Sequence, residues 1–226
     1  MKRFRVAILA SGSGTTAEAF IRTVQHEDYP IEVALVVSNN KTAGIFDRIA
    51  QLNAKFGLHI ETAVINSYQP ASKEPLVHGQ QTEAEQAALL ALLQQHSVDL
   101  VLLLGYMKRI GPLLLRAYGW QPSYTSIYQA RMLNTHPGLL PATIGTHGLG
   151  TQEFTLAQGM TEGGQTLHVV SDTYDTGPTV VEHRVPVDPG ETAESFFARV
   201  QAVEKQHITA DVMAFMQAQE NYQKEA

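Results

Sequence analysis

The sequence contains no cysteine, and this absence removes several kinds of chemistry at once. Without thiols the chain forms no disulfide bond, builds no thiolate metal site and has no cysteine nucleophile. It also lacks long apolar runs, since 100–104 is far too short to span a membrane and the apolar stretch after the basic start 1–5 is too short for a signal peptide. We therefore expect a cytoplasmic protein with no membrane partner.

An excess of positive charge is missing as well. The chain has 16 Lys and Arg against 22 Asp and Glu, a net charge of −6, so no field over the whole surface attracts nucleic acid. Nine histidines include His136, His147 and His168, but none shows a tight metal-ligand spacing. A Gly-x-Ser-x-Gly elbow is lacking too, which disfavours a serine hydrolase. We expect small-molecule substrates, no nucleic acid and no metal.

Strands and helices alternate in the first half of the chain. Apolar runs that end in Ser, Gly or Asn are typical of buried strands, and Thr82 with Glu85 matches a helix-starting capping box. This alternation favours an α/β, Rossmann-like fold, a mostly parallel twisted sheet with helices on both faces. The expected strands are 4–10, 31–37, 59–64 and 99–104, and the expected helices begin near residues 15, 44 and 82.

The second half of the chain departs from that alternation. Two apolar segments joined by a short loop predict an antiparallel hairpin in the C-terminal part. With no internal repeat and no low-complexity linker, we expect a single domain over 1–226. The expected elements are a loop at 66–80, a helix at 113–118, irregular chain at 119–130, a strand at 131–134, a helix at 151–158, strands at 164–170 and 179–185, and a helix at 192–217, possibly broken, with a polar tail after it.

The first motif with chemical meaning is Ser11-Gly12-Ser13-Gly14-Thr15-Thr16, between the first strand and the first helix. Backbone amides at a helix N-terminus carry partial positive charge and bind phosphate, while glycines allow close approach. The turn lacks the third glycine of a dinucleotide fingerprint and the Gly-Lys-Ser/Thr of a P-loop. A phosphate site and a plain flexible turn both remain open on these residues alone.

The second motif is Asn134-Thr135-His136, followed by Pro137-Gly138 and by Pro141. Asn134 and His136 lie two apart in an extended segment, so their side chains share one face. An amide donor holds a developing oxyanion and an imidazole moves protons near neutral pH, which is what addition to a carbonyl requires. A lone histidine is more often structural, so the pair predicts such a centre without proving it.

The third motif is His168 with the segment Ser171–Pro178, which contains Asp172 and Asp175. Two acids before Gly177-Pro178 are ordinary turn chemistry. A carboxylate here would also orient an imidazole and favour its charged form. On the residues alone, either acid or neither reaches His136.

Together these motifs resemble the folate-dependent glycinamide ribonucleotide formyltransferases, from Arg5 to about Phe215. The most specific segments are Asn134-x-His136-Pro137-x-Leu139-Leu140-Pro141, His168-x5-Tyr174-Asp175-x-Gly177-Pro178 and Gly105-Tyr106-Met107-Lys108-Arg109-Ile110. The resemblance implies a substrate-binding half at about 1–105 and a folate-binding, catalytic half at about 106–220. It implies catalysis by Asn134, His136 and Asp175 with support from His168, phosphate binding by Gly14, Thr15 and Thr16, contact of Glu204 with the substrate ribose, and folate binding by Met107, Lys108, Arg109, Ile110, Asn134 and Lys73.

The chain departs from the family pattern at two of these places. Thr15-Thr16 stands where the family usually has Ser-Asn, so an amide donor is lost. Lys108 stands where the family usually has Arg, which keeps the charge but loses the planar fork. Three segments, 66–80, 119–130 and 146–151, look longer than in typical relatives.

The reaction that the resemblance implies is transfer of a formyl group from 10-formyltetrahydrofolate, the co-substrate, to the amine of glycinamide ribonucleotide in de novo purine (IMP) biosynthesis. A monomer or a homodimer is expected. The alternatives are a formyltetrahydrofolate hydrolase, a formyltransferase for an amino-sugar nucleotide or for initiator tRNA, and an inactive folate- or nucleotide-binding protein. Hydrolases usually add an N-terminal domain and the tRNA enzymes a C-terminal one, and we expect neither here.

Overall fold

A computed structural model describes residues 3–68 and 76–225 of the chain. Its strands are β1 (Phe4–Leu9), β2 (Ile31–Ser38), β3 (Glu61–Val64), β4 (Leu100–Leu103), β5 (Met132–His136), β6 (Glu162–Val169) and β7 (Thr179–Pro186). Its helices are α1 (Thr15–His26), α2 (Ile45–Phe56), α3 (Glu83–Gln95), α4 (Pro112–Tyr118), the 3-10 turn η1 (Ile127–Gln129), α5 (Leu149–Ala157) and α6 (Ala193–Glu225).

The strands form one seven-stranded sheet in the order β3-β2-β1-β4-β5-β6-β7. Strands β1 to β5 are parallel, whereas β6 runs antiparallel to both β5 and β7. From β1 the chain adds strands first on one side, through β2 and β3, and then on the other side, through β4 and β5. In open α/β sheets the crevice at such a reversal is where ligands bind, so the carboxyl ends of β1 and β4 mark the expected site.

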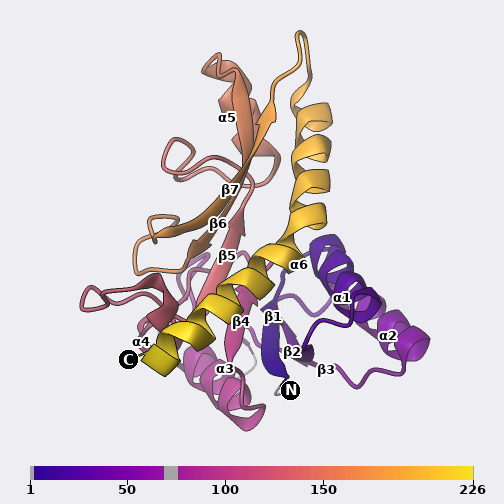
Figure 1. Cartoon of the computed structure of the whole chain (residues 1–226), viewed down its shortest axis with the longest axis vertical. Coiled ribbons are helices and arrows are strands. Elements are labelled where there is room, and N and C mark those ends of the chain that lie inside the picture. The colour runs from indigo at the N-terminus through magenta and orange to yellow at the C-terminus, as the bar shows by residue number, and fades with distance from the viewer. Residues whose placement is uncertain (1–2, 69–75, 226) are drawn as a thin grey trace.

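Helices cover both faces of the sheet, which confirms the predicted Rossmann-like class (Figure 1). Alternate residues of β1 face opposite layers, because successive side chains of a strand point to opposite sides. Val6 and Ile8 pack with α1, α2 and α6, while Ala7 and Leu9 pack with α3 and α4. A third apolar cluster joins β7 to the beginning of α6 beyond the parallel strands.

The expected elements of the first half are confirmed to within a few residues. Helix α3 begins after Thr82, whose hydroxyl accepts a hydrogen bond from the Glu85 backbone N–H while the Glu85 carboxylate accepts one from the Thr82 N–H. This is the predicted capping box, and it satisfies two donors that a bare helix end leaves unpaired.

Two predicted ends in the second half are wrong. Strand β5 continues to His136 instead of ending at Asn134, because its last residues pair with β6. Helix α6 runs to Glu225 without a polar tail, and Figure 1 shows that it bends along its length. Its polar final turns are held by Gln219, whose Nε2 donates to the carbonyls of Tyr128 and Ala130. Tertiary pairing therefore extends both elements beyond their local sequence signals.

The capping box gives a test of the fold. We expect Thr82→Ala to lower the free energy of unfolding by about 1 kcal/mol, the usual cost of losing an N-cap hydroxyl. Thr161→Ala, at an exposed position, is the matched control and should leave stability within about 0.5 kcal/mol of wild type. Denaturant unfolding followed by circular dichroism measures both, and equal stabilities for the two variants would contradict the capping assignment.

Candidate active site

Two cavities open at the carboxyl edge of the sheet, next to the ends of β1, β4 and β5. The larger, about 220 Å³, lies against the first turn of α1 and is called the α1 cavity. The smaller, about 30 Å³, lies behind the end of β4 and is called the β4 cavity. Four residues line both and form the junction between them: Tyr106, Asn134, Tyr174 and Asp175. The predicted Asn134 and Asp175 thus lie where the two spaces meet.

Asn134, His136 and Asp175 converge at this junction from β5 and from the β6–β7 loop. The Nδ1 of His136 lies 3.4 Å from Asp175 Oδ2, and Asn134 Nδ2 lies 3.5 Å from Asp175 Oδ1. Both His136 and Asp175 are buried. Of the two acids between which the residue pattern could not choose, Asp175 is the one beside His136. The backbone carbonyl of Asp172 instead accepts a hydrogen bond from the Arg109 guanidinium.

The orientation of the His136 ring follows from its second nitrogen. Its Nε2 lies 2.9 Å from the hydroxyl of Thr143, and that hydroxyl donates to the carbonyl of Leu139 at 3.0 Å. A hydroxyl has one hydrogen, so the Thr143 oxygen accepts from His136 and Nε2 carries a proton. The Nδ1 is then the nitrogen that faces the Asp175 carboxylate.

His168, on the neighbouring strand β6, orients the amide of Asn134. Its Nδ1 donates to the Val169 carbonyl at 3.0 Å, which leaves Nε2 facing Asn134 Nδ2 at 3.0 Å. Because an amide nitrogen only donates, Nε2 accepts from Asn134. This bond fixes which end of the Asn134 side chain faces the junction. His168 Nε2 also lies 3.5 Å from Asp175 Oδ1, so the supporting position predicted for it is consistent with the geometry.

The carboxyl group of Asp175 is held in its ionised form. Burial by itself raises the pKa of Asp175, but the groups beside the carboxylate, the His136 imidazole first among them, outweigh burial and lower the pKa to about 2. Among the described residues, none forms a hydrogen bond with Oδ2, and His136 Nδ1 approaches it at 3.4 Å. Such contacts tighten in a reacting complex.

The backbone of the β6–β7 loop is equally constrained. Asp175 has φ of 56°, a left-handed conformation that is uncommon outside glycine. At Gly177 a Cβ would lie 1.7 Å from the carbonyl oxygen of Val169, so only glycine fits between the loop and β6. The Gly177-Pro178 turn therefore does more than reverse the chain: it presses the loop against β6 and places Asp175 at the junction.

The turn after β1 forms the opposite wall of the α1 cavity. Gly14 precedes α1 with φ of 72°, and none of the described side chains caps the helix. The carbonyls of Gly12 and Ser13 accept from the Ile45 N–H at 3.3 Å and from Arg48 Nε at 2.7 Å. Contacts with the N-terminal part of α2 thus hold the turn in place. Because no described side chain caps α1, the N–H groups of its first turn are available to bind an anionic ligand in the cavity. Gly14, Thr15 and Thr16 all line it.

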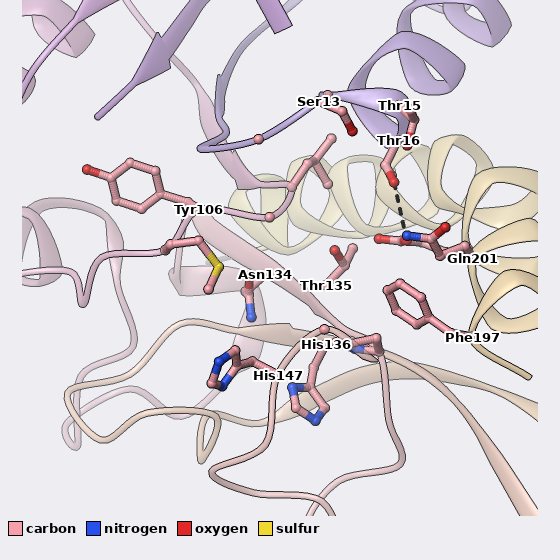
Figure 2. A pocket seen from close by; sticks show the side chains of 18 of the residues that line it. Ser13, Thr15, Thr16, Tyr106, Asn134, Thr135, His136, His147, Phe197 and Gln201 are labelled. Carbon is pink, nitrogen blue, oxygen red and sulfur yellow. Dashed lines mark hydrogen bonds between the residues drawn. The ribbon is translucent and has the colours of Figure 1, made fainter. Parts of the chain in front are cut away.

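Glu204 reaches the α1 cavity from α6. Its Oε2 accepts from the Thr16 hydroxyl at 3.2 Å (Figure 2). Burial raises the pKa of Glu204, and the hydroxyls of Thr135 and Thr16 lower it only in part. Figure 2 shows Thr15 and Thr16 on one side of the cavity and Asn134 and His136 on the other. The residues expected to bind phosphate and ribose therefore face Asn134 and His136, the predicted catalytic pair, across one space.

The stretch predicted to bind folate divides between the two cavities. Met107 lines the α1 cavity, whereas Lys108, Arg109 and Ile110 line the β4 cavity. The ammonium of Lys108 forms an ion pair with the fully buried Glu85 and donates a hydrogen bond to the Ser67 hydroxyl, so its charge is neutralised within the protein. Arg109 is exposed, and its guanidinium donates to the carbonyl of Asp172. The predicted Lys73 lies outside the described residues.

Several residues of the site carry no local signal in the sequence. Thr143 and Thr135 reach His136 and Glu204 only through the fold. Phe197 and Gln201 line the α1 cavity from α6, about two turns and one turn, respectively, before Glu204. Their spacing of four residues with each other places them on the helix face that Glu204 also occupies, and this periodicity is the one signal that would have pointed to them. Tyr174 belongs to the third motif, and the sequence pattern assigns it no role of its own.

Neither a metal centre nor a membrane span is found in the part of the chain that the structure describes. No group of three His, Asp or Glu side chains there is placed to hold a metal ion. No described helix is both long and apolar enough to cross a bilayer.

Comparisons with known proteins identify the family. The formyl transferase family model matches residues 4–212. This chain belongs to the formyl transferase family. Phosphoribosylglycinamide formyltransferase of Bacillus subtilis is 31% identical over 204 residues, covering 90% of this chain and 89% of that protein. The corresponding protein of Mycobacterium tuberculosis is 31% identical over 210 residues, covering 93% and 84%.

Solved structures of this family share the fold. Phosphoribosylglycinamide formyltransferase from Bacillus halodurans superposes with a TM-score of 0.76 at 31% identity, over 94% of this chain and 95% of that one. Glycinamide ribonucleotide transformylase 1 from Geobacillus kaustophilus gives a TM-score of 0.77 at 30% identity, over 94% and 98%. The likeness extends across the sheet and its helices, and it agrees with the family resemblance of the motifs.

The low pKa of Asp175 predicts a pH dependence of stability. Its folded value of about 2 lies below the ordinary 3.8, so the ionised carboxylate stabilises the fold above about pH 4, and this contribution is lost as pH falls through about 2. We expect wild type to exceed Asp175→Asn by on the order of 2 kcal/mol near pH 6. Urea unfolding from pH 7 to pH 3 should show the difference shrinking below pH 4, and a constant difference would contradict the assignment.

Proposed function

We propose that this chain is a phosphoribosylglycinamide formyltransferase, which moves the formyl group of 10-formyltetrahydrofolate to the amine of glycinamide ribonucleotide in purine biosynthesis. The observation that carries the proposal is the position of Asn134 and Asp175 at the junction of two cavities, with His136 beside Asp175 in the α1 cavity, which ends on the N-terminus of α1. A two-substrate transfer needs two binding spaces that meet at one acid/base centre. Membership of the formyl transferase family supports the same chemistry.

The acceptor fits the α1 cavity. Its phosphate would bind the first-turn amides of α1 with Gly14, Thr15 and Thr16, where the helix dipole favours negative charge. Its ribose hydroxyls would reach Glu204, which lies on the opposite wall beside Thr16. The amine at the other end of the molecule then points toward Asn134 and His136, since those side chains lie across the cavity from the phosphate turn.

The donor fits the β4 cavity and its surroundings, with the formyl group at the junction. At about 30 Å³ this cavity holds roughly one water molecule, so a bicyclic ring needs a wall to move. Arg109 is the exposed wall, and its bond to the Asp172 carbonyl is the contact that would break. Folate contacts by Met107, Lys108, Arg109 and Ile110 are thus part of the proposal, with the Lys108 charge already balanced by Glu85.

In the transfer step the uncharged amine attacks the formyl carbon, and a tetrahedral oxyanion forms. Asn134, oriented by His168, donates a hydrogen bond to that oxyanion, an effect worth about 3 kcal/mol in comparable sites. The carbon–nitrogen bond to folate then breaks, and protonated His136 delivers the proton that the departing nitrogen needs. The proton that the attacking amine loses restores the protonated imidazole. Asp175 holds the imidazole through Nδ1 and balances its charge. Alignment of two bound substrates supplies much of the remaining acceleration.

Three further features stay predictions. One domain over 1–226, divided near residue 105 into an acceptor half and a donor half, agrees with the two cavities but is proposed only. A cytoplasmic location and a monomeric or homodimeric state follow from the sequence expectations. Absence of a nucleic-acid partner likewise rests on the net charge of −6.

Replacement of Asp175 and His136 tests the proposed acid/base centre. We expect Asp175→Asn and His136→Ala to lower kcat by roughly a hundred- to ten-thousand-fold, the usual worth of a positioned proton-transfer group. Asp172→Asn is the matched control, since its exposed side chain lies in the same loop without touching His136, and it should retain wild-type turnover within about twofold. Circular dichroism and thermal unfolding check that each variant folds. Near-wild-type turnover in Asp175→Asn would remove the proposed centre.

The phosphate turn predicts a different kinetic signature. Replacing Thr15 and Thr16 together by leucine should raise KM for glycinamide ribonucleotide roughly tenfold or more, because each lost charge-assisted hydrogen bond costs about 1.5–3 kcal/mol. Since phosphate binding is the same in ground and transition states, kcat should change far less. KM for the folate donor should stay unchanged. Replacing both threonines by serine keeps the hydroxyls and should restore the acceptor KM.

A further inference from the structure

The junction has one exposed member that the transfer step does not use. Of its four residues, Tyr106 is 4% exposed and Asp175 is 7% exposed, whereas Tyr174 is 45% exposed. Tyr174 lines both cavities, so its ring lies at the boundary between the donor and acceptor spaces. Its exposure leaves the Tyr174 side chain accessible to molecules that enter either space.

Contacts on both sides hold the backbone of Tyr174 at the junction. On its N-terminal side, the Thr173 carbonyl accepts from the hydroxyls of Ser171 at 2.9 Å and Thr176 at 3.0 Å. On its C-terminal side, Asp175 is held in the left-handed conformation, and Gly177 is pressed against β6. None of these contacts involves Arg109, so opening the Arg109–Asp172 bond leaves them intact.

A water molecule at the junction would hydrolyse the formyl donor. A water molecule at the position of the amine would attack the formyl carbon, the carbon–nitrogen bond to folate would break, and formate and tetrahydrofolate would form with a proton passed to the folate nitrogen. Asn134, His136 and Asp175 serve this hydrolysis as well as they serve transfer. The centre itself therefore does not discriminate between water and an amine, and discrimination requires a group that excludes water.

We propose that Tyr174 is this specificity-determining residue: its ring covers the junction between the bound substrates and keeps water from the formyl carbon. The inference rests on the proposed formyl transfer. An aromatic ring suits the task, because it is large, apolar and rigid. Burial and the Asp175 charge raise the pKa of the Tyr174 phenol, so its hydroxyl stays uncharged at neutral pH and brings no ion into the junction.

Three variants test the proposal, with 10-formyltetrahydrofolate and glycinamide ribonucleotide as substrates. Tyr174→Ala opens the junction, and Tyr174→Phe keeps the ring without the hydroxyl. Ile144→Ala is the matched control, since Ile144 is 44% exposed and lines neither cavity. Formate and formylated amine are quantified in the same reaction. We expect the ratio of formate to formylated amine to rise at least tenfold in Tyr174→Ala, and to stay within about twofold of wild type in Tyr174→Phe and Ile144→Ala.

The outcomes separate the inference from the function beneath it. A merely structural role for Tyr174 lowers formate and formylated amine together and leaves their ratio unchanged, which would overturn the inference alone. A rise of the ratio in Tyr174→Phe equal to that in Tyr174→Ala would overturn the role of the ring. Wild-type protein that forms no formylated amine would overturn the proposed function and the inference with it. Should Tyr174→Ala fail to fold, Tyr174→Leu takes its place with the same expected rise.

Discussion

The buried carboxylate of Asp175 lies within 3.5 Å of the imidazoles of both His136 and His168, and the rest of the site is built to keep it there. A buried charge is costly unless it is paired. Here the pairing is supplied by side chains from two adjacent strands, so the carboxylate, the imidazoles and the Asn134 amide fix one another. The left-handed backbone at Asp175 and the close approach of Gly177 to β6 hold the loop in place.

The sheet topology decides what this centre faces. Reversal of the strand order at β1 and β4 opens a crevice at the carboxyl edge, and β5 brings Asn134 and His136 to the same edge. The N-terminus of α1 then lies on one side of the crevice and the 105–111 stretch on the other. The exchange of direction at β6 carries His168 and the Asp175 loop back over the junction. In the proposed reaction, a phosphate-bearing acceptor and a ring-bearing donor would thereby approach one centre from two sides.

Local patterns in the sequence predicted most elements of this fold, because apolar strands, the Thr82 capping box and the Gly-rich turn act over a few residues. They also placed Asn134 and His136 on one face of a strand. They could not choose between Asp172 and Asp175, since that choice depends on a loop folded against β6. Nor did they show that Lys108 is neutralised by Glu85, or that Thr143 orients His136, because each contact joins segments that only the tertiary structure brings together. The final turns of α6 were missed for the same reason, as Gln219 finds its partners near η1.

The proposed transfer requires that the formyl group leaves the donor only when an amine is present to receive it. The most direct measurement is therefore tetrahydrofolate release from 10-formyltetrahydrofolate, followed with and without glycinamide ribonucleotide. The account predicts release that depends on the amine and matches the formylated product one for one. Release at the same rate without the amine would contradict it and would identify a hydrolase.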